Sequence, residues 1–397
     1  MGGKDLHEFA KESYLSYRNE HRPKVSRSVD RIKRLIEKEV ASWGKSWFSM
    51  PPRRRLWLWR NGFMSRSDAL YDVGHDREYD RYLSDYQRNR AAYINGRRSV
   101  ALDDKVVFHW MMEPFDEHRV DTYGLILDGR FHDLNALRRA ADGVGELRYA
   151  GDDGSGASLR GTEDAAEWVL RRLRSQGSLV LKPAGGSGGQ NVMFCSYEDG
   201  SYFVGDEERS AADLESTVAE LDEYLVTETI EQAAYADELF PGSVNTLRVL
   251  TMFDPVEDEP FVAIAVQRIG TSRSAPVDNF SGGGLTAEVD RETGRLSAGA
   301  TYPYSGSVEW HETHPDTATP IEGTEVTGWP EVREGLLDMA GAFSHTPYIG
   351  WDVVVTGDGE FAIIEANNCS DVDLLQIHRP LLDDARVRRF YAHHDVI

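Results

Sequence analysis

The segment from Gly350 to Asn367, GWDVVVTGDGEFAIIEAN, reads as a hairpin whose two runs are mainly hydrophobic but carry Asp352, Glu365 and Asn367. Its two apolar runs flank Asp358-Gly359, a dipeptide that favours a two-residue type I′ turn. Counting outward from that turn places Asp352 directly opposite Glu365, so both lie on one face with Cβ atoms about 5 Å apart. Asn367 follows two residues after Glu365 and shares the face. We call Asp352, Glu365 and Asn367 the hairpin triad.

Two carboxylates this close repel each other unless a cation lies between them. Carboxylate and amide oxygens are ligands for hard cations, so the hairpin triad predicts a Mg²⁺ site. The simpler interpretation is a solvent-exposed acidic hairpin in an acidic protein.

The charge composition restricts the classes of partner. Asp and Glu number 67 against 44 Lys and Arg, a net charge of −23, which argues against general nucleic-acid binding. An acidic surface with few Lys fits a cytosol of high ionic strength, such as that of a halophile. After Lys45 the chain contains only Lys105 and Lys182. Arg does not replace Lys where a compact point charge must fit, so either both lysines bind a ligand or their retention is chance.

The remaining composition predicts a cytoplasmic protein. Cys195 and Cys369 form neither a disulfide framework nor a metal-binding spacing. The N-terminus lacks the apolar segment of a signal peptide, and no run of about 18 apolar residues could span a membrane.

Residues 1–60 are basic, with 15 Lys and Arg against 7 Asp and Glu. Within residues 43–60 Trp alternates with Arg. Such a segment could contact an anionic membrane, a lipid-linked substrate or a partner protein. The alternative, which we favour, is a helical cap whose Trp side chains pack on the main body. Residues 62–100 are expected to be helical, without chemistry of their own.

A glycine-rich unit surrounds Lys182. A strand at 179–181 precedes it, four glycines follow between 185 and 189, and a second strand occupies 191–195. The unit is no Walker A loop, because it lacks the GK[ST] sequence and a strand follows it. Backbone N–H groups of such a hairpin can cover phosphates, although a flexible surface hairpin would have the same sequence.

Later segments supply further polar candidates. A strand ending at Glu228 and Ile230 could contact adenine through its backbone. Two strands, 243–253 and 261–270, carry Arg248 and Arg268, whose guanidinium groups suit oxyanions. Glu231, Asp237 and Glu238 are candidates for binding ribose hydroxyls. Asp278 and Asn279 precede three glycines, and such a run allows the backbone to approach a ligand closely.

Taken together, these motifs resemble the ATP-grasp superfamily. In chain order they are Asp104-Lys105, the strand–Lys182–glycine unit, the Glu228 hinge, Asn245 and Arg248, Asp278-Asn279 before a glycine run, and Asp352…Glu365-x-Asn367. The 13-residue and 2-residue spacings of the hairpin triad match the family's metal-binding residues. Between about 100 and 380 the chain is most similar to the sugar-transfer-associated ATP-grasp group.

The resemblance implies an α+β fold in which two α+β subdomains clasp ATP, with a helical N-terminal extension. We therefore expect a helical, basic region at 1–100 and an N-terminal lobe at 101–150. A small subdomain with the glycine-rich lid would occupy 151–230, and a large subdomain with the metal site 231–397.

The resemblance also implies roles for individual residues. Lys105 and Lys182 would bind the ATP phosphates. Gly186, Ser187 and Gly188 would cover the phosphates. Glu228 and Ile230 would contact adenine. The hairpin triad would hold one or two Mg²⁺, with Mn²⁺ as an alternative. Arg248, Arg268 and Asn279 would stabilise the transferred phosphoryl group.

The implied activity is ATP-dependent ligation of a carboxylate to an amine or a thiol through an acyl phosphate. The substrates would be small or glycan-linked molecules, such as a sugar acid or an amino sugar in polysaccharide biosynthesis. The alternatives are a phosphotransferase acting on a sugar hydroxyl and a non-catalytic nucleotide-binding partner of a glycosyltransferase.

Overall fold

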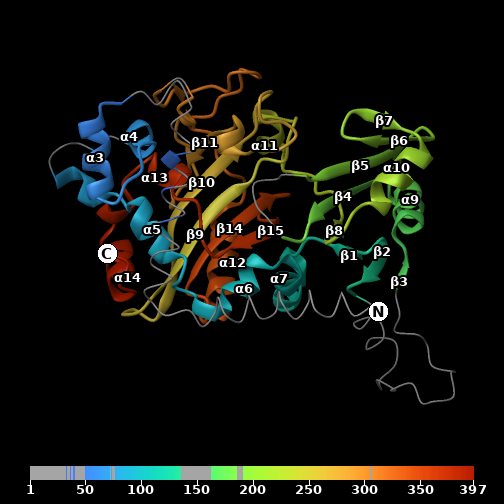
Figure 1. Cartoon of the computed structure of the whole chain (residues 1–397), viewed down its shortest axis with the longest axis horizontal. Helices are drawn as coiled ribbons and strands as arrows, with labels where there is room; N and C mark the ends of the chain where they lie inside the picture. Colours follow the sequence, from blue (N-terminus) through green and yellow to red (C-terminus); the bar gives the residue numbers. More distant parts are fainter. Residues whose placement is uncertain are drawn as a thin grey trace, which may run out of the picture.

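The computed structural model describes residues 33, 36, 39, 40, 50–71, 73, 77–135, 162–185, 191–304 and 306–397. Its strands form two sheets that lie side by side, with helices packed on both (Figure 1). Neighbouring strands in the described sheets are antiparallel throughout. Helices beside antiparallel sheets make this an α+β fold, as the sequence predicts.

The first sheet has eight strands in the order β3-β2-β1-β8-β4-β5-β6-β7. They are β1 Thr122–Leu127, β2 Arg130–Asp133, β3 Thr162–Asp164, β4 Ser178–Pro183, β5 Met193–Glu198, β6 Ser201–Val204, β7 Glu207–Arg209 and β8 Tyr224–Thr227. Helices α9 (Ala165–Gln176) and α10 (Ala211–Ala219) pack against each other and form a core with this sheet. Strands β1 and β2, which the sequence assigns to a separate lobe, share one sheet with β4–β8.

The second sheet has seven strands in the order β13-β12-β11-β10-β9-β14-β15. They are β9 Leu247–Asp254, β10 Glu259–Ile269, β11 Leu285–Glu288, β12 Gly299–Thr301, β13 Trp310–His311, β14 Tyr348–Val355 and β15 Phe361–Asn367. The two faces of β9 belong to different cores. Val249 packs in the core that includes helix α12 (Trp329–Ala342), and Met252 packs in the core that includes helix α14 (Ala385–His393). Because both faces are covered, the central strands β9 and β14 are almost wholly buried.

The helices outside these layers are short. They are α3 Pro52–Arg60, α4 Ser67–Leu70, α5 Asp85–Ala91, α6 Val100–Asp103, α7 Lys105–Met111, α11 Ala234–Leu239 and α13 Asp373–Gln376. Single 3₁₀ turns span Arg77–Arg81, Gly96–Ser99, Glu113–His118, Phe280–Gly282 and Leu381–Asp383. None of the helices in the described part of the chain is long and apolar enough to cross a membrane.

The N-terminal helices pack on the second sheet, as expected for a helical cap. Trp57 of α3 meets the ring of Tyr79 edge to face, with centroids 5.4 Å apart, and the Arg54 guanidinium lies 4.5 Å from the centre of the Trp57 ring. Trp59 on the same helix is exposed. Trp43 and Trp47 lie outside the described residues. Packing of Trp57 favours the cap interpretation for this part of 43–60.

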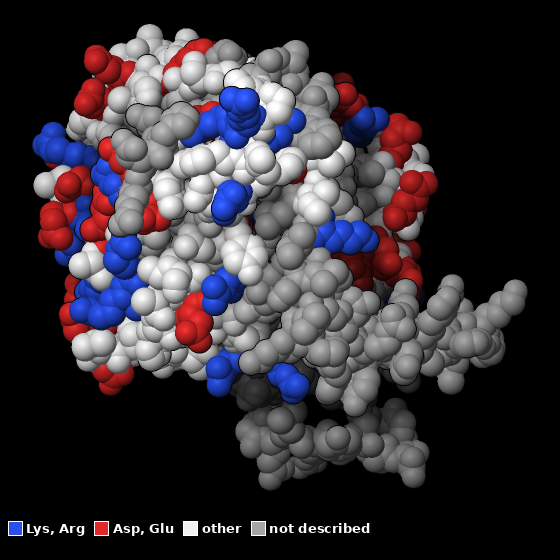
Figure 2. Space-filling model, turned by 60° about the vertical axis from the view of Figure 1, so that its left-hand side comes forward, with Lys and Arg blue, Asp and Glu red and all other residues white. Residues whose placement is uncertain are grey.

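Charged groups on the face formed by the N-terminal and C-terminal helices are interleaved rather than separated into blocks (Figure 2). Many of them are paired. Arg81 lies 2.6 Å from Asp383, and Arg386 lies 2.7 Å from Asp254. Such pairs offset local repulsion in an acidic protein, although exposed pairs contribute little to stability individually.

Helix α9 begins at Ala165, directly after β3, to which Glu163 and Asp164 belong. The Asp164 side chain accepts a hydrogen bond from the Glu167 amide, 3.0 Å away, so Asp164 is the N-cap of the helix. Gly177 ends the helix at φ 86°, a conformation that favours glycine.

Candidate active site

The β14–β15 hairpin pairs Asp352 with Glu365 and Gly350 with Asn367, which confirms the predicted pairing. The predicted two-residue turn is wrong. The Thr356 amide donates to the Glu360 carbonyl at 2.9 Å, so Gly357–Gly359 form a three-residue loop. Next to the loop, the strands pair Val353 with Ile363. Ile364 is then the extra residue of a bulge, which restores the predicted pairing of Asp352 with Glu365.

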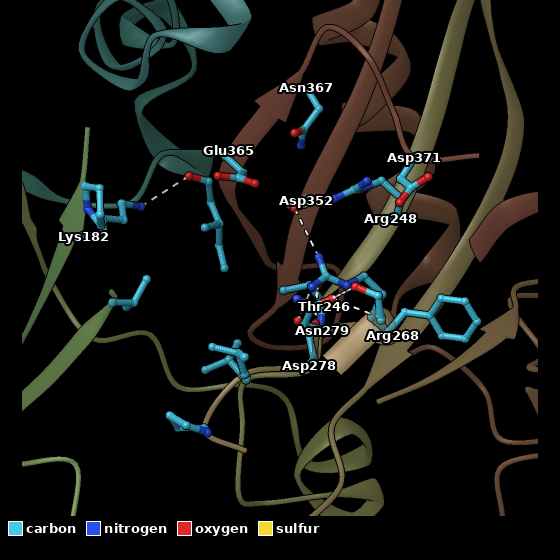
Figure 3. Close-up of a pocket in the computed structure, with 18 of the residues that line it drawn as sticks. Lys182, Thr246, Arg248, Arg268, Asp278, Asn279, Asp352, Glu365, Asn367 and Asp371 are labelled. Atoms are coloured by element: carbon cyan, nitrogen blue, oxygen red, sulfur yellow. Dashed lines mark hydrogen bonds and ion pairs between the residues drawn. The ribbon is translucent and has the colours of Figure 1, made fainter. Parts of the chain in front are cut away.

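A cavity of about 650 Å³ lies between the two sheets, with the hairpin triad in its wall (Figure 3). The predicted site residues that line it are Lys105, Lys182, Glu228, Ile230, Arg248, Arg268, Asn279, Asp352, Glu365 and Asn367. Residues far apart in the sequence therefore meet in one place, and the acidic-hairpin interpretation does not explain this convergence.

Other predicted residues are not among those lining the cavity. Glu231 and Asp237 are exposed, and Gln232 donates to the Asp237 carboxylate at 3.3 Å. Gly186, Ser187 and Gly188 lie outside the described residues, although their neighbour Gly185 lines the cavity.

Asn245, one of the motif residues, secures the backbone instead of entering the cavity. Its amide nitrogen donates to the carbonyls of Ala236 and Phe240 at 2.8 and 2.7 Å. Its oxygen accepts from the Gly270 amide at 2.8 Å. All of these contacts are buried, so Asn245 connects α11 to the ends of β9 and β10.

The two lysines that remain after Lys45 reach the same edge of the hairpin triad. Asp104 caps α7 by accepting from the amides of Val106 and Val107 at 2.9 and 3.0 Å, which presents Lys105 at the helix start. Lys105 Nζ lies 3.7 Å from Glu365 Oε2.

Lys182 reaches the hairpin from β4 of the opposite sheet. Its Nζ donates to the carbonyl of Ile364 at 3.5 Å, the residue that the bulge leaves unpaired. Burial lowers the pKa of Lys182 to about 8, and the positive charge of Lys105 acts in the same direction while Glu365 opposes it. Two positive charges therefore line the same part of the cavity, which suits an anion.

The carboxylates of the triad differ in their surroundings. Burial acts to raise the pKa of Asp352, but Arg248 and Arg268 outweigh burial and hold it below its ordinary value. Burial raises the pKa of Glu365, and the negative charge of Asp352 raises it further. Repulsion between the two acids is thus present in the protein alone, and a cation between them would relieve it.

Asn367 has an unsatisfied donor. Its side-chain nitrogen is buried without a hydrogen-bond partner among the described residues, and such an N–H group is expected to donate to a ligand oxygen, whereas a cation would bind the amide oxygen. No group of three or more His, Cys, Asp or Glu side chains in the described ranges could hold a metal ion. The third donor here is an amide, which Mg²⁺ accepts alongside carboxylates.

Two arginines lie beside the triad on β9 and β10. Arg248 pairs with Asp352 through two nitrogens, with NH2 2.8 Å from Oδ2. Arg268 lies 3.3 Å from the same Oδ2 and 2.5 Å from Asp278. Asp278 also accepts from the amide and hydroxyl of Thr246 at 2.8 and 2.6 Å. The guanidinium groups are therefore held at fixed positions in the cavity wall.

The opposite end of the cavity is more apolar. Val180, Phe194 and Ile230 line it together with Glu228. The Glu228 amide donates to the Asp121 carbonyl, and its carboxylate accepts from the Asp121 amide, both at 2.9 Å. This reciprocal bond joins the end of β8 to the start of β1 and leaves the chain after Glu228 beside a hydrophobic recess of the kind that holds a flat ring.

Sequence reasoning missed the wall beyond Arg248. It contains Arg66, Arg88, Phe280, Tyr302, Asp371 and Asp373. Arg66 and Arg88 belong to the region that was expected to carry no chemistry. The signal available was the segment SDVDLLQ shortly after the hairpin triad, whose two acids, Asp371 and Asp373, received no role.

These features agree with the comparison against known families. Residues 92–385 match the family described as sugar-transfer associated ATP-grasp. The chain has the ATP-grasp fold, and it belongs to this family. No curated protein matches the chain.

Several solved structures are similar at low identity. One is the ATP-grasp ligase PsnB complexed with a phosphomimetic variant of its minimal precursor, Mg and ADP, at 15% identity and a TM-score of 0.36, covering 75% of this chain and 61% of that chain. Another is the D-alanine-D-alanine ligase from Coxiella burnetii, at 11% identity and a TM-score of 0.34, covering 74% of this chain and 58% of that chain. A third is the L-amino acid ligase from Bacillus licheniformis, at 8% identity and a TM-score of 0.30, covering 68% of this chain and 40% of that chain. The chain thus spans about three fifths of the length of the first solved structures it matches.

Proposed function

We propose that the protein is an ATP-dependent ligase that joins a carboxylate to an amine, or to a thiol, through an acyl phosphate. The observation that carries this proposal is the convergence in one cavity of the hairpin triad, two lysines and two arginines. This set suits a nucleoside triphosphate with its cation at one side and an acidic second substrate at the other. Membership of an ATP-grasp family supports the same assignment.

The roles follow from position. Lys105 and Lys182 bind the phosphates as point charges, and the glycine segment around Gly185 covers them. The apolar recess beside Glu228 and Ile230 holds adenine. The hairpin triad would hold Mg²⁺, which would neutralise charge on the nucleotide phosphates. Arg248, Arg268 and Asn279 stabilise the phosphoryl group during its transfer.

The proposed reaction has two steps. An oxygen of the substrate carboxylate attacks the γ-phosphorus as the bond to the β–γ bridging oxygen breaks, which yields ADP and an acyl phosphate. The amine nitrogen then forms a bond to the acyl carbon as the carbon–oxygen bond to phosphate breaks. The nitrogen loses its proton to the departing phosphate. Catalysis rests on positioning and on charge stabilisation in a cavity from which water is excluded.

We place the reaction in the cytoplasm, on a sugar acid or amino sugar of a growing glycan. The family description, which associates these proteins with sugar transfer, supports that substrate class. The net charge of −23 supports an environment of high ionic strength.

The test is a screen for ADP release in the presence of Mg²⁺, at low and high KCl. Sugar acids, amino acids and amino sugars are offered singly and in carboxylate–amine pairs. We expect phosphate release that requires both a carboxylate and an amine or a thiol, and a product with an amide or thioester bond. Phosphorylated sugar without ligation would show a phosphotransferase instead, and nucleotide binding without turnover of any pair would show a non-catalytic partner.

The matched variants are Glu365→Gln and Asp338→Asn. Both remove one negative charge, but Asp338 lies exposed on α12 and does not line the cavity. Turnover is expected to disappear in E365Q and to persist in D338N. Equal turnover in both variants contradicts the metal site and, with it, the proposed mechanism.

A further inference from the structure

The cavity extends past Arg248 into a charged end wall built by two distant parts of the chain. Arg66 precedes α4 and Arg88 lies on α5, both in the N-terminal helical region. Asp371 and Asp373 follow β15 on the opposite side of this wall. Figure 3 shows Asp371 beyond Arg248, on the side of the cavity away from Lys182.

Asp373 is fully engaged within the protein. One of its oxygens lies 2.7 Å from Arg66 NH2, and the other accepts from the Tyr71 hydroxyl at 2.9 Å. Arg66 also lies 3.2 Å from Asp85, and Asp85 in turn accepts from the Met64 amide at 2.8 Å. Tyr71, Asp85 and Asp373 are buried and Arg66 is partly buried, and their contacts hold the N-terminal region against the segment after β15.

Asp371 differs from Asp373 in its access to the cavity. Its side chain is 47% exposed, and Arg88 lies 3.4 Å from its Oδ1. The same oxygen accepts from the Asp373 amide at 3.4 Å. In the part of the chain that the structure describes, the second oxygen, Oδ2, accepts no hydrogen bond. Asp371 therefore presents a carboxylate oxygen to whatever enters this end of the cavity.

The guanidinium groups of Arg66 and Arg88 pair with the carboxylates of Asp373 and Asp371 in the end wall. Asp85, a second partner of Arg66, is not among the residues that line the cavity. Partial burial acts against ionisation of Asp371, but Arg88 and Arg66 outweigh it and lower its pKa to about 2. Asp371 is thus a negative charge at neutral pH. An ionised carboxylate with a free oxygen in the cavity wall favours a cationic group with N–H donors.

We propose that Asp371 binds the ammonium group of the amine substrate. This inference rests on the proposed ligase function and names the place where its second substrate enters. Asp371 lies close enough to Arg248 for their charges to interact, so an amine held there is next to the group assigned to the acyl phosphate. Phe280, Tyr302 and Leu374 offer apolar surface for the carbon skeleton of the amine.

The proposal is tested by binding, without catalysis. The probes are ethanolamine, its neutral counterpart ethylene glycol, and acetate, added to the protein with ADP and Mg²⁺ and followed by saturation-transfer NMR. We expect saturable binding of ethanolamine and weaker or no binding of the other two. In Asp371→Asn the ethanolamine affinity is expected to fall about 10- to 100-fold, as for the loss of one charged hydrogen-bond partner. In Asp338→Asn it is expected to be unchanged.

Three results overturn the proposal: equal ethanolamine affinity in wild-type protein and D371N, tighter binding of acetate than of ethanolamine, or no binding of ethanolamine to the wild type. The wild-type comparison requires no variant, so it decides the matter even if D371N does not fold. Thermal unfolding of D371N separates loss of the ammonium site from loss of structure.

The two proposals fail in different ways. ADP release that requires an amine, with ethanolamine affinity unaffected by D371N, retains the ligase and removes the ammonium site. Ethanolamine binding that depends on Asp371, in a protein that releases no ADP with any substrate pair, retains the ammonium site and removes the ligase.

Discussion

Arg248 and Asp352, which are 104 residues apart in the sequence, form a two-point ion pair on neighbouring strands of the second sheet. Asp352 is thereby engaged on both oxygens, since Arg268 shares Oδ2. Its partner across the hairpin, Glu365, has no arginine partner among the described residues and lies 3.7 Å from Lys105. The two acids of the triad therefore contribute differently to stability, although the proposed metal site needs both.

This difference predicts opposite stability effects for two substitutions. Glu365→Gln removes a repelled carboxylate, so we expect its Tm to be unchanged or higher than that of the wild type. Asp352→Asn leaves the buried guanidinium group of Arg248 without its charge partner, although Arg268 keeps Asp278, and the loss should cost about 3–5 kcal/mol of unfolding free energy. Both should lower ATP turnover about 100-fold or more. Thermal unfolding and ADP release measure the two effects, and equal Tm changes would contradict the assignment.

Arg248→Lys should lower turnover about 10²- to 10³-fold while changing nucleotide affinity little. A lysine retains the charge but cannot make the planar two-point contact, so the transferred phosphoryl group loses an aligned pair of donors. The comparison is kcat against the dissociation constant of a fluorescent ATP analogue. Arg295→Lys is the matched control, because Arg295 pairs with Glu325 on an exposed surface. A parallel loss of affinity in R248K would assign Arg248 to ground-state nucleotide binding instead.

Nucleotide binding should weaken above pH 8. The pKa of Lys182 is lowered from 10.5 to about 8 by burial, so the free protein loses this charge as pH rises through 8. The dissociation constant of an ATP analogue should then increase by up to about tenfold per pH unit, because only the charged form binds phosphate well. In Lys182→Met this dependence should be absent between pH 7 and 10 and the affinity lower throughout.

The contribution of Lys182 to the free energy of unfolding should increase with pH, whereas nucleotide affinity should decrease. Between pH 8 and 10.5 the unfolded chain binds more protons at Lys182 than the folded protein does, so the Lys182 contribution to the free energy of unfolding rises with pH. A nucleotide affinity that follows stability in this range would show that unfolding, rather than the charge of Lys182, governs binding.

Potassium chloride should stabilise the protein. With a net charge of −23, screening reduces repulsion among surface carboxylates. We expect Tm to rise as KCl increases from 0.1 M to about 2 M, and Tm should change less in a neutral osmolyte of matched osmolality. A fall in Tm across the same range would contradict adaptation to high ionic strength, since it would show that attractive pairs such as Arg386–Asp254 dominate.

The pairing of Asp352 with Glu365 could be predicted because hairpin register is a local property. The predicted pairing is correct although the predicted two-residue turn is wrong. The longer loop at Gly357–Gly359 shifts the register by one residue, and the bulge at Ile364 shifts it back. The bulge follows from neither propensity nor pattern. It leaves Ile364 without a pairing residue on β14, and Lys182 of the other sheet contacts the Ile364 carbonyl.

The sequence by itself determined that Asp352 lies opposite Glu365 and that Lys105 and Lys182 are the lysines that remain after Lys45. Each depends on residues close in the chain, or on the scarcity of one residue type. Only the tertiary structure decided that Arg66 and Arg88 complete the cavity, and it left Glu231 and Asp237 outside the lining. Contacts between segments about 300 residues apart, such as Tyr71 with Asp373, arise from packing of whole layers. Local propensity and spacing do not encode that packing.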